Sequence, residues 1–578
     1  MLNLFYNYTP MKNILFIWLA LILGTISASA QPNLNALHLE KEVKKSIAKA
    51  YQAVVRIADY DTVTHTARIA NFSGVVVDAE GHVLSAAHAV KPNGMYQVSF
   101  PDGRTFTAKG LGNIDFIDAA MLQITDKGNW PYAAMGWSAN LKTFIPCVSI
   151  SHPGSTLLYT EKPAVRFGYV ADTKPVNSNY AQFFRSTCLM EPGDSGGPVF
   201  DLHGRVMGIH SRIGYTLADN YEIPIDHFRK YWDVLLKPKK YSRTELPAPQ
   251  QLTDDPMKAT LVPVEQLVAL SNMPDVKRII ELQGQSCFML SSNLAGKQNT
   301  ILATLLNLKS FMPQKTDKHN SYLVSKSSML GDNVTLILPF GNELKARILK
   351  RDQFNDLALI EVAGNLSGGV QLDRINADSV AFSDVGQFLV SPVTAGKAIV
   401  SVLSNTTISI FPLVGLYADD TGKKIVITQK DTISAIREAG LLANDELLEI
   451  NGVALQRKRD IQREVFNQNG QDSITLRFNR LGKTIEKRIL LQRMKTDLNN
   501  TNFHMAEWFE GGKSIRRDGF GSVFIHDGKI TPEQCGGPLF GLNGKFYGIN
   551  MARLSRTTTL AIPAKLIADF VQGCSQIH

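Results

Sequence analysis

The sequence is poor in cysteine and, after its first thirty residues, has no apolar run long enough to cross a membrane. Only five of its 578 residues are cysteine and none forms a C-x-x-C pair, which excludes a disulfide scaffold and a zinc ribbon. One disulfide in an oxidising compartment stays open. No metal, nucleotide or haem motif occurs, so we expect no cofactor.

A strong charge of one sign is also absent. Lys+Arg number 61 and Asp+Glu 52, and the resulting net charge of +9 is spread along the chain. A modest, dispersed excess of this kind indicates ordinary surface charge and no nucleic-acid partner. Hydrophobic residues make up 44% and charged residues 20%, which is typical of globular protein, and the length predicts about three or four domains.

The N-terminus has the pattern of a secretory signal peptide. Residues 12–30 read KNILFIWLALILGTISASA, in which a lysine precedes a short apolar run that ends in an Ala-x-Ala cleavage site. This assigns residues 1–30 to a signal peptide and the mature start to Gln31; an uncleaved anchor is the alternative, and translation can begin at Met1 or Met11. We expect an exported protein, periplasmic or secreted, with no membrane span in its mature form.

Most of the remaining chain predicts short β-strands. Residues 37–57 begin with helical spacing and run into a strand, and from about 53 to 233 short apolar runs alternate with Gly, Pro, Asn and Asp. Many short strands separated by turn residues are typical of a β-sandwich or barrel. Residues 235–262 carry four prolines among charged side chains, which is the composition of a linker.

Two parts of the chain repeat each other. Residues 195–212, SGGPVFDLHGRVMGIHSR, return as CGGPLFGLNGKFYGINMAR at 535–553, and DFIDAAMLQI at 115–124 returns as QFNDLALIEV at 353–362. Self-similarity of this kind indicates one domain that occurs twice. The second copy is interrupted by residues 409–492, whose sequence has a different character.

Three motifs of the first copy place a histidine, an aspartate and a serine in order along the chain. His88 follows the run VLSAA, Asp118 precedes the run AAMLQI, and Ser195 lies in the turn PGDSGGP. Each motif alone is also typical of a plain strand end or tight turn. Together they fit a serine activated by a histidine base that a carboxylate orients. The N–H groups of Gly193 and Ser195 would form an oxyanion hole, because glycine lets the backbone turn its N–H inward.

On these residues, the stretch 45–233 resembles the trypsin-like domain of chymotrypsin-type serine proteases, most closely the HtrA/DegP branch. The resemblance rests on His88, Asp118, the GDSGGP turn and the closing Ile-Pro-Ile-Asp at 223–226. It implies two packed antiparallel β-barrels with the site between them, and peptide-bond hydrolysis through an acyl-enzyme. It also implies unfolded or damaged polypeptides as substrates, and it leaves a homo-oligomer open.

The residues around the nucleophile turn bear on specificity and activation. Leu189 and Met190 stand where this fold shapes its specificity pocket, and no aspartate stands there, so we expect an apolar or small side chain before the scissile bond. His210, on the strand after the nucleophile, is expected to line the substrate cleft. The predicted mature N-terminus has no apolar residue that could insert and pair with Asp194, which argues against activation as a zymogen.

The second copy lacks parts of the same machinery. Alignment puts Ser327 at the position of the catalytic histidine, keeps the aspartate as Asp356, and puts Cys535 at the position of the nucleophile. Glu533 replaces the oxyanion-hole glycine and disfavours the same backbone turn. We therefore expect a degenerate site there; a thiol protease that recruits His526 as its base is the alternative.

The inserted segment resembles a PDZ domain. AGLLANDELLEINGVAL at 439–455 has the Gly-Leu pair, turn acid and Ile-Asn-Gly hairpin of that family. The resemblance implies a module that binds peptide C-termini by adding the peptide as a strand. Val414, Gly415 and Leu416 are the candidates for gripping the terminal carboxylate; a module that serves only for packing is the alternative.

The sequence therefore predicts a mainly β protein with two double β-barrel, trypsin-like domains plus a small α+β PDZ-like domain. The expected domains are the signal peptide (1–30), the active trypsin-like domain (31–234), the linker (235–262), the degenerate trypsin-like domain in two parts (263–408 and 495–578), and the PDZ-like domain (409–494). The expected function is an exported serine endopeptidase that cleaves unfolded or damaged proteins. The alternative is a peptide-binding or chaperone-like scaffold with little basal proteolysis.

Overall fold

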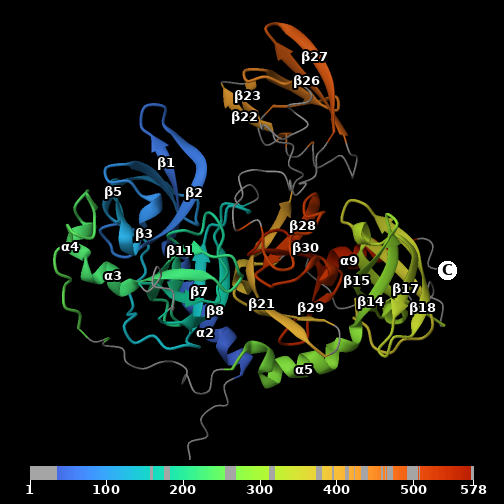
Figure 1. Cartoon of the computed structure of the whole chain (residues 1–578). Helices are drawn as coiled ribbons and strands as arrows, with labels where there is room; N and C mark the ends of the chain where they lie inside the picture. The colour runs from blue at the N-terminus through green and yellow to red at the C-terminus, as the bar shows by residue number, and fades with distance from the viewer. Residues whose placement is uncertain are drawn as a thin grey trace, which may run out of the picture.

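The described residues form four closed β-barrels of six strands each and one further sheet, so the mainly β fold predicted from the sequence is confirmed (Figure 1). The structure is a computed structural model. It describes residues 35–156, 160–174, 182–253, 255, 268–311, 319–372, 380–393, 396–410, 416–421, 424–430, 440–456, 460–461, 464, 473–490, 506 and 508–574. The predicted signal peptide, Val414 and Gly415 lie outside the described residues.

The first unit consists of two barrels that follow one another in the chain (Figure 1). In the first barrel the strand order is β5-β4-β1-β2-β3-β6, and β6 closes the ring by pairing with β5; the order in the second barrel is β10-β11-β12-β9-β8-β7. Strand alternation supplies the cores: Val55 and Ile57 of β1 are fully buried, whereas Arg56 between them is partly exposed. The strands are β1 (Val54–Asp61), β2 (Thr66–Val76), β3 (His82–Ala86), β4 (Met95–Ser99), β5 (Thr105–Ile114), β6 (Ala119–Ile124), β7 (Pro146–Ser151), β8 (Ala164–Asp172), β9 (Phe184–Ser186), β10 (Pro198–Phe200), β11 (Val206–Ile213) and β12 (Asn220–Pro224).

The second unit repeats this architecture. Its barrels have the orders β14-β15-β16-β19-β18-β17 and β20-β21-β28-β31-β30-β29. The internal repeat seen in the sequence therefore corresponds to a repeated double barrel. The strands are β14 (Cys287–Leu294), β15 (Lys297–Leu306), β16 (Asn320–Lys326), β17 (Asp332–Ile337), β18 (Glu343–Asp352), β19 (Leu357–Ala363), β20 (Phe388–Pro392), β21 (Ala398–Ile410), β28 (Phe520–His526), β29 (Pro538–Gly541), β30 (Phe546–Arg553) and β31 (Thr559–Pro563).

The further sheet is inserted between two paired strands of the last barrel. β21 and β28 are neighbours in that barrel, and the chain between them forms a separate sheet of order β22-β23-β24-β26-β27, with β25 on β24 (Figure 1). Ile427, Ile450 and Phe478 belong to a core of its own. Within the described residues, β22 pairs only with β23, so one of its edges is open. The strands are β22 (Leu416–Thr421), β23 (Lys424–Lys430), β24 (Glu446–Ile450), β25 (Val453–Ala454), β26 (Ser473–Arg480) and β27 (Lys483–Leu490).

An amphipathic helix, α2 (Ala36–Ala50), precedes the first barrel. The side chain of Asn35 caps it by accepting the N–H of His38 at 2.8 Å. Leu39, Val43 and Ile47 recur at every fourth position and are buried, so one stripe of the helix packs on the protein. The other helices are α3 (Ile225–Lys230), α4 (Trp232–Leu235), α5 (Pro274–Gln283), α6 (Leu308–Phe311) and α9 (Ala564–Gln572).

Helix α2 touches both units (Figure 1). On the first unit, Ser46 Oγ donates to the carbonyl of Asp201 at 2.8 Å. On the second, the carboxylate of Glu40 accepts the N–H of Phe388 at 2.7 Å. The carboxylate of Asp275, in α5, accepts the backbone N–H groups at the start of α2. The helix therefore ties the two double barrels to each other.

The segment predicted as a linker lies along the first unit over its first half. Residues Lys240–Tyr241 form β13, which pairs in parallel with β5 of the first barrel. Farther on, the indole of Trp137 donates to the carbonyl of Thr253 at 3.1 Å, and Arg205 pairs with Asp255 at 3.1 Å. Proline and charge in the sequence indicated a segment without long strands, but they carry no information on what such a segment packs against.

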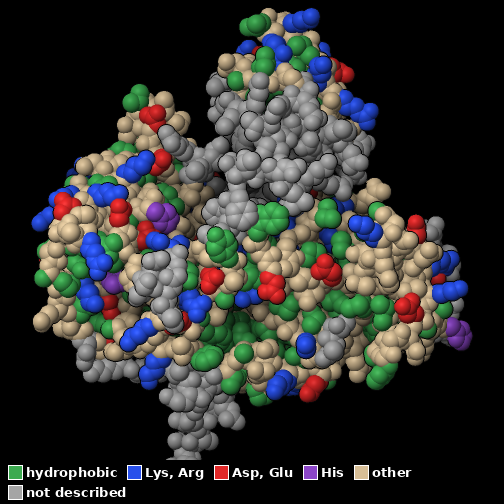
Figure 2. All heavy atoms as spheres, viewed as in Figure 1, with side chains coloured by type: hydrophobic (Ala, Val, Ile, Leu, Met, Phe, Trp, Pro, Cys, Tyr) green, Lys and Arg blue, Asp and Glu red, His purple; other side chains and the backbone are tan. Residues whose placement is uncertain are grey.

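Surface composition agrees with the even charge distribution of the sequence. Figure 2 shows acidic and basic side chains interspersed over the visible face of both units. Among the helices of the described residues, none is long and apolar enough to span a membrane.

Candidate active site

His88 and Asp118 meet at the end of two paired strands. His88 lies in the 3-10 turn η2 (Ala87–Ala89) after β3, and Asp118 directly precedes β6, the partner of β3. Asp118 has a left-handed backbone (φ 56°), which aspartate tolerates better than most residues. Its carboxylate accepts the backbone N–H of His88 at 2.9 Å and lies 3.0 Å from Nδ1 of the ring. The imidazole is thus held through Nδ1, which leaves Nε2 as the nitrogen that can take up a proton.

The environment of Asp118 favours its ionised form. Ser211 Oγ donates to Oδ2 at 2.6 Å, and the guanidinium of Arg212 lies 3.7 Å from the same oxygen. Burial raises the pKa of Asp118, but the hydrogen bonds and charge of His88, together with the Ser211 hydroxyl, outweigh it and hold that pKa below its ordinary value. An ionised aspartate can stabilise an imidazolium beside it. The His88 side chain is 48% exposed, so a substrate can reach it.

Ser195 lies in the turn before β10, next to the strand that leads to His88. The following residue, Gly196, packs so closely on that strand that an added Cβ would lie 2.0 Å from Ser85 Oγ. The Gly196 N–H donates to the carbonyl of His210, on β11, at 2.8 Å. The structure therefore places the serine turn beside β3 and β11. Ser211, which follows His210 on β11, binds Asp118.

Gly193 has the backbone conformation that the sequence analysis expected of it. Its φ is 99°, and a Cβ there would lie 2.6 Å from the carbonyl oxygen of His152, so only glycine fits. The carbonyl of Pro192 accepts the N–H of Gly154 at 2.8 Å, which holds that carbonyl in place. Within the described residues, the N–H groups of Gly193 and Ser195 have no hydrogen-bond partner. Two free donors at this spacing can stabilise an oxyanion.

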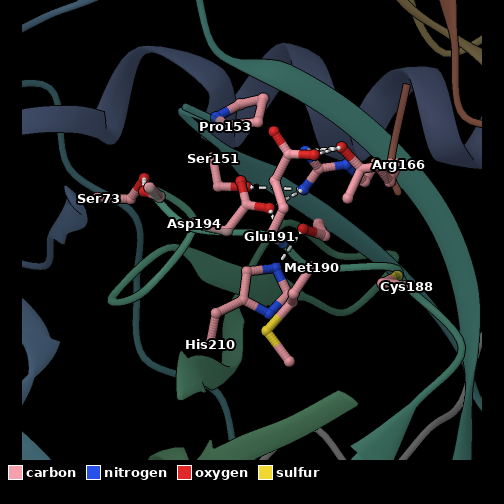
Figure 3. A network of polar contacts seen from close by, with 12 residues as sticks. Ser73, Ser151, Pro153, Arg166, Cys188, Met190, Glu191, Asp194 and His210 are labelled. Carbon is pink, nitrogen blue, oxygen red and sulfur yellow. Dashed lines mark hydrogen bonds and ion pairs between the residues drawn. The ribbon is translucent and has the colours of Figure 1, made fainter. Parts of the chain in front are cut away.

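Asp194 is paired with a cation from inside the barrel (Figure 3). Arg166 Nη1, on β8, lies 2.9 Å from the carboxylate, and both side chains are at most 1% exposed. Ser151 Oγ and the N–H of Glu191 each donate to the same carboxylate at 2.8 Å. Burial raises the pKa of Asp194; Arg166 opposes this rise and the Glu191 carboxylate adds to it. The fold therefore supplies internally the positive charge that an inserted N-terminus would provide.

The specificity and cleft residues are placed differently from expectation. Leu189 and Met190 are each 3% exposed, and Leu189 lines a cavity of about 330 Å³ at the junction of the two units. His210 is fully buried and bonds to Ser149 and Glu222 inside the second barrel. The prediction that His210 lines the substrate cleft is therefore wrong, because strand alternation turns this side chain inward.

In the second unit, the register differs by one residue from the sequence alignment. Ser328, not Ser327, is central in the 3-10 turn η8 (Ser327–Met329) and donates its N–H to Asp356 at 2.6 Å, as His88 does to Asp118. Ser327 Oγ instead accepts from Arg351 at 2.9 Å. The misalignment arose because the two copies differ at every residue of this turn. Asp356 also pairs with the buried Lys326 at 2.8 Å, so a fixed ammonium stands beside the aspartate.

Cys535 stands at the position of Ser195, and among the described residues its thiol contacts the hydroxyl of Ser514 and the carbonyl of Thr531 but no base. It is fully buried, and burial raises the pKa of its thiol. His526 is occupied elsewhere: Nε2 contacts the side chain of Asn550 at 2.9 Å and Nδ1 accepts the N–H of Gly528 at 3.2 Å. Burial lowers the pKa of His526 to about 3. Glu533 lies in the 3-10 turn η11 (Pro532–Gln534), without the left-handed conformation of Gly193. The geometry gives no support to a thiol protease.

Sequence reasoning missed two residues of the first site. Arg166 is a lone arginine in the apolar run AVRFGYV, a pattern that indicates a buried and therefore paired cation. Ser211 is replaced by Met551 in the second copy, so a comparison of the copies could have found it. Within the described part of the chain, no group of three or more His, Cys, Asp or Glu is arranged to hold a metal ion.

Comparison with known proteins gives a class for part of the chain. Residues 72–209 match the sequence model of the family described as "Trypsin-like peptidase domain". His88, Asp118 and Ser195 all lie within the matched residues. The chain therefore contains a trypsin-like peptidase domain.

Particular relatives are HtrA/DegP-like serine proteases, and each matches over part of its length. The chain is 32% identical over 160 residues to "Probable periplasmic serine endoprotease DegP-like" of Hahella chejuensis, a match that covers 27% of this chain and 33% of the relative. It is 25% identical over 218 residues to "Serine protease HTRA1A" of Danio rerio, covering 36% and 44% respectively. The chain thus matches about a third to two fifths of the length of these relatives.

Proposed function

We propose that the first unit is a serine endopeptidase in which Ser195 is the nucleophile, His88 the general base and Asp118 the residue that orients the base. The observation that carries this proposal is the bond between the Asp118 carboxylate and His88 Nδ1, placed beside a serine turn with two free N–H donors. The match to a trypsin-like peptidase domain supports it.

The geometry suits acyl transfer in two steps. Ser195 Oγ attacks the carbonyl carbon of the scissile peptide while its proton passes to His88 Nε2, and Asp118 stabilises the imidazolium. The oxyanion of the tetrahedral intermediate accepts the N–H groups of Gly193 and Ser195. The imidazolium then gives its proton to the leaving amine, the C–N bond breaks, and an ester to Ser195 remains. Water repeats the sequence on this ester, which releases the acid and restores the hydroxyl.

The substrates that we propose are unfolded or damaged polypeptides outside the cytoplasm. One relative carries "periplasmic" in its name, and the N-terminal sequence has the pattern of a signal peptide. An extended, unfolded chain can enter a site between two barrels more readily than a folded protein, because its backbone is free to adopt the strand conformation of a bound substrate.

We propose that the inserted sheet is a PDZ-like module for peptide C-termini. Leu416 begins β22, whose outer edge is open within the described residues, and an open edge can accept a peptide strand. The second unit would then have no catalysis of its own, since a buried Cys535 and a paired Asp356 replace the reacting groups.

The test is covalent labelling of residues 31–578 with a fluorophosphonate probe. We expect the wild type and Cys535→Ala to be labelled, and Ser195→Ala and His88→Ala to remain unlabelled. The wild type should also degrade an unfolded protein such as casein. If correctly folded wild type is not labelled, even with an unfolded peptide present, the endopeptidase proposal is wrong and the peptide-binding scaffold is favoured.

A further inference from the structure

One loop of the second unit reaches the nucleophile turn of the first. Residues 554–558, here called the 554–558 loop, connect β30 to β31. The corresponding connection of the first unit, residues 214–219, joins β12 to β11, the strand whose Ser211 binds Asp118. In the described residues, the 554–558 loop docks on the first unit through Ser555, Arg556 and Thr557.

Thr557 is the centre of this docking. Its hydroxyl accepts from Arg166 Nη2 at 3.3 Å and donates to the Glu191 carboxylate at 2.9 Å. Arg166 and Glu191 are both buried, and each of them also bonds the residue next to the nucleophile, Asp194. A single hydroxyl from the second unit therefore joins two of the three partners of the Asp194 carboxylate.

Glu191 and Asp194 enclose the peptide that carries the Gly193 N–H. The N–H of Glu191 donates to the Asp194 carboxylate at 2.8 Å, and the N–H of Asp194 donates to the Glu191 carbonyl at 3.0 Å. One oxygen of the Glu191 carboxylate accepts the hydroxyl of Thr557, and the other accepts the N–H of Ser155 at 2.9 Å. Figure 3 shows Glu191 and Asp194 at the two ends of this turn. Because both ends are fixed in this way, the orientation of the peptide between them is fixed as well.

The rest of the loop holds the neighbouring segments. Ser555 Oγ accepts from the hydroxyl of Ser155 at 3.1 Å. Arg556 Nη2 donates to the carbonyl of Thr216 at 2.6 Å and approaches Asn220 Oδ1 at 3.4 Å, the oxygen that also accepts the N–H of Met190. The loop thus contacts three segments of the first unit that surround Ser195.

The loop is itself rigidly held by the second unit. The N–H of Leu554 donates to the carbonyl of Thr558 at 3.0 Å. The guanidinium of Arg553, which is 1% exposed, binds the carbonyl of Arg556 and the hydroxyl of Thr559. A loop that is already rigid can fix its neighbours, because contacts within its own unit have already offset the conformational entropy lost on ordering it.

We infer that the 554–558 loop is a positioning element that the second unit supplies, within one chain, to the oxyanion hole of the first. Thr557 is its main positioning residue and acts through Glu191 and Arg166. The inference rests on the proposed endopeptidase function and gives the catalytically inactive copy a role in it. Activity of the first unit then depends on the docking of the second.

The test uses the full chain and a pair of matched variants. Thr557→Val keeps the shape of the side chain and removes both hydrogen bonds. The Glu191 carboxylate then keeps the N–H of Ser155, and the Arg166 guanidinium keeps Asp194, but the hydroxyl that joins the two groups is lost. Thr558→Val makes the same change on the next residue, whose hydroxyl has that of Thr557 as its one hydrogen-bond partner in the part of the chain that the structure describes. Thr557→Ser restores the hydroxyl. For each protein we would measure the rate constant of fluorophosphonate labelling per folded molecule, and kcat and KM for a peptide substrate.

We expect Thr557→Val to lower the labelling rate and kcat by about tenfold to a hundredfold, with KM little changed. Thr557→Ser should return close to the wild-type rate, and Thr558→Val should stay close to it. Labelling of folded Thr557→Val at the wild-type rate would overturn the inference, and so would equal losses in the two valine variants. Absence of labelling in folded wild type would instead contradict the endopeptidase function itself.

If Thr557→Val folds poorly, Ser155→Ala keeps the test open. This variant removes only the hydroxyl contact to Ser555 and leaves the backbone N–H that binds Glu191. The inference expects a smaller loss of kcat than Thr557→Val would give, at unchanged KM. Unchanged kcat in Ser155→Ala would then contradict a positioning role for the loop as a whole.

Discussion

Replacing Arg166 by methionine should disable the nucleophile turn without removing any catalytic group. Methionine keeps an unbranched apolar side chain but removes the guanidinium and its charge. Asp194 would then stay buried, at 0% exposure, with two neutral donors from Ser151 and Glu191 and no cation. Thr557 would lose a donor as well.

The expected loss of stability in Arg166→Met follows from the burial of the Arg166–Asp194 ion pair. Removing one partner of a buried ion pair typically costs about 3–5 kcal/mol, because the other charge is left uncompensated. Two donors remain on Asp194, which favours the lower end, about 3 kcal/mol. If that cost falls on the conformation that presents the Gly193 N–H, labelling of Ser195 should slow by about a hundredfold.

The assay combines urea unfolding with fluorophosphonate labelling of the full chain. Loss of the cation raises the pKa of Asp194 further above its ordinary value, so the folded protein binds a proton more readily than the unfolded chain. The deficit in stability should therefore be largest at pH 7 and should shrink as the pH is lowered. A double variant, Arg166→Met with Asp194→Asn, should be more stable than Arg166→Met alone, because no buried charge is left.

A matched control is available in the same barrel. Arg185 pairs with Asp172 at 3.4 Å, but both side chains are 28% exposed. Arg185→Met should cost less than about 1 kcal/mol, as exposed pairs do. If Arg166→Met costs no more than this control and is labelled at the wild-type rate, the internal cation does not support the turn and the reasoning fails.

Three further outcomes are expected. Burial raises the pKa of Asp527, at the unit junction, from 3.8 to about 6, so the free energy of unfolding should rise as the pH falls between these values. In urea unfolding, the stability of the wild type relative to Asp527→Asn should increase by up to about 1.4 kcal/mol for each pH unit of this fall. A difference that stays constant with pH would contradict the prediction. The buried thiols of Cys147 and Cys188 lie 3.8 Å apart, so treatment with oxidised glutathione should form a disulfide between them, which peptide mapping would detect. Finding only mixed disulfides with glutathione at these residues would refute this prediction. Asp118→Asn should lower kcat by about ten-thousandfold through the wrong imidazole tautomer of His88, and a loss below tenfold would argue against its role.

The local parts of the candidate site could be predicted from the sequence, because each lies in a short motif with a fixed geometry. A histidine after β3 and an aspartate before β6 meet because those strands pair, and the glycine-rich turn leaves few backbone conformations for Ser195. The repeat was also visible, since GGP and the following strand survive in both copies.

The contacts across the molecule could not be predicted in this way. Arg166 pairs with Asp194 and Thr557 only because β8 and the second unit face the same turn, and no sequence spacing encodes that. The inward side chain of His210 depends on strand phase, where one residue reverses the face. The same sensitivity explains the shift from Ser327 to Ser328.

In the second unit, the aspartate that corresponds to Asp118 has cationic partners of its own. Lys326 pairs with Asp356 at 2.8 Å, and Arg516 lies 3.6 Å from the same carboxylate. Burial raises the pKa of Asp356, but the charges of Lys326 and Arg516 outweigh burial and hold it below its ordinary value. Asp356 is thus part of a buried ion-pair cluster with Lys326 and Arg516.

The position of helix α2 has a consequence for the order in which the protein folds. Its Glu40 binds Phe388, which is 348 residues farther along the chain. A contact of that separation closes only after the second unit has been synthesised, and large sequence separations slow folding. The first described helix is therefore among the last elements to reach its final place. Until then, the part of its apolar stripe that packs against Gly386 of the second unit, at Val43 and Ile47, is exposed.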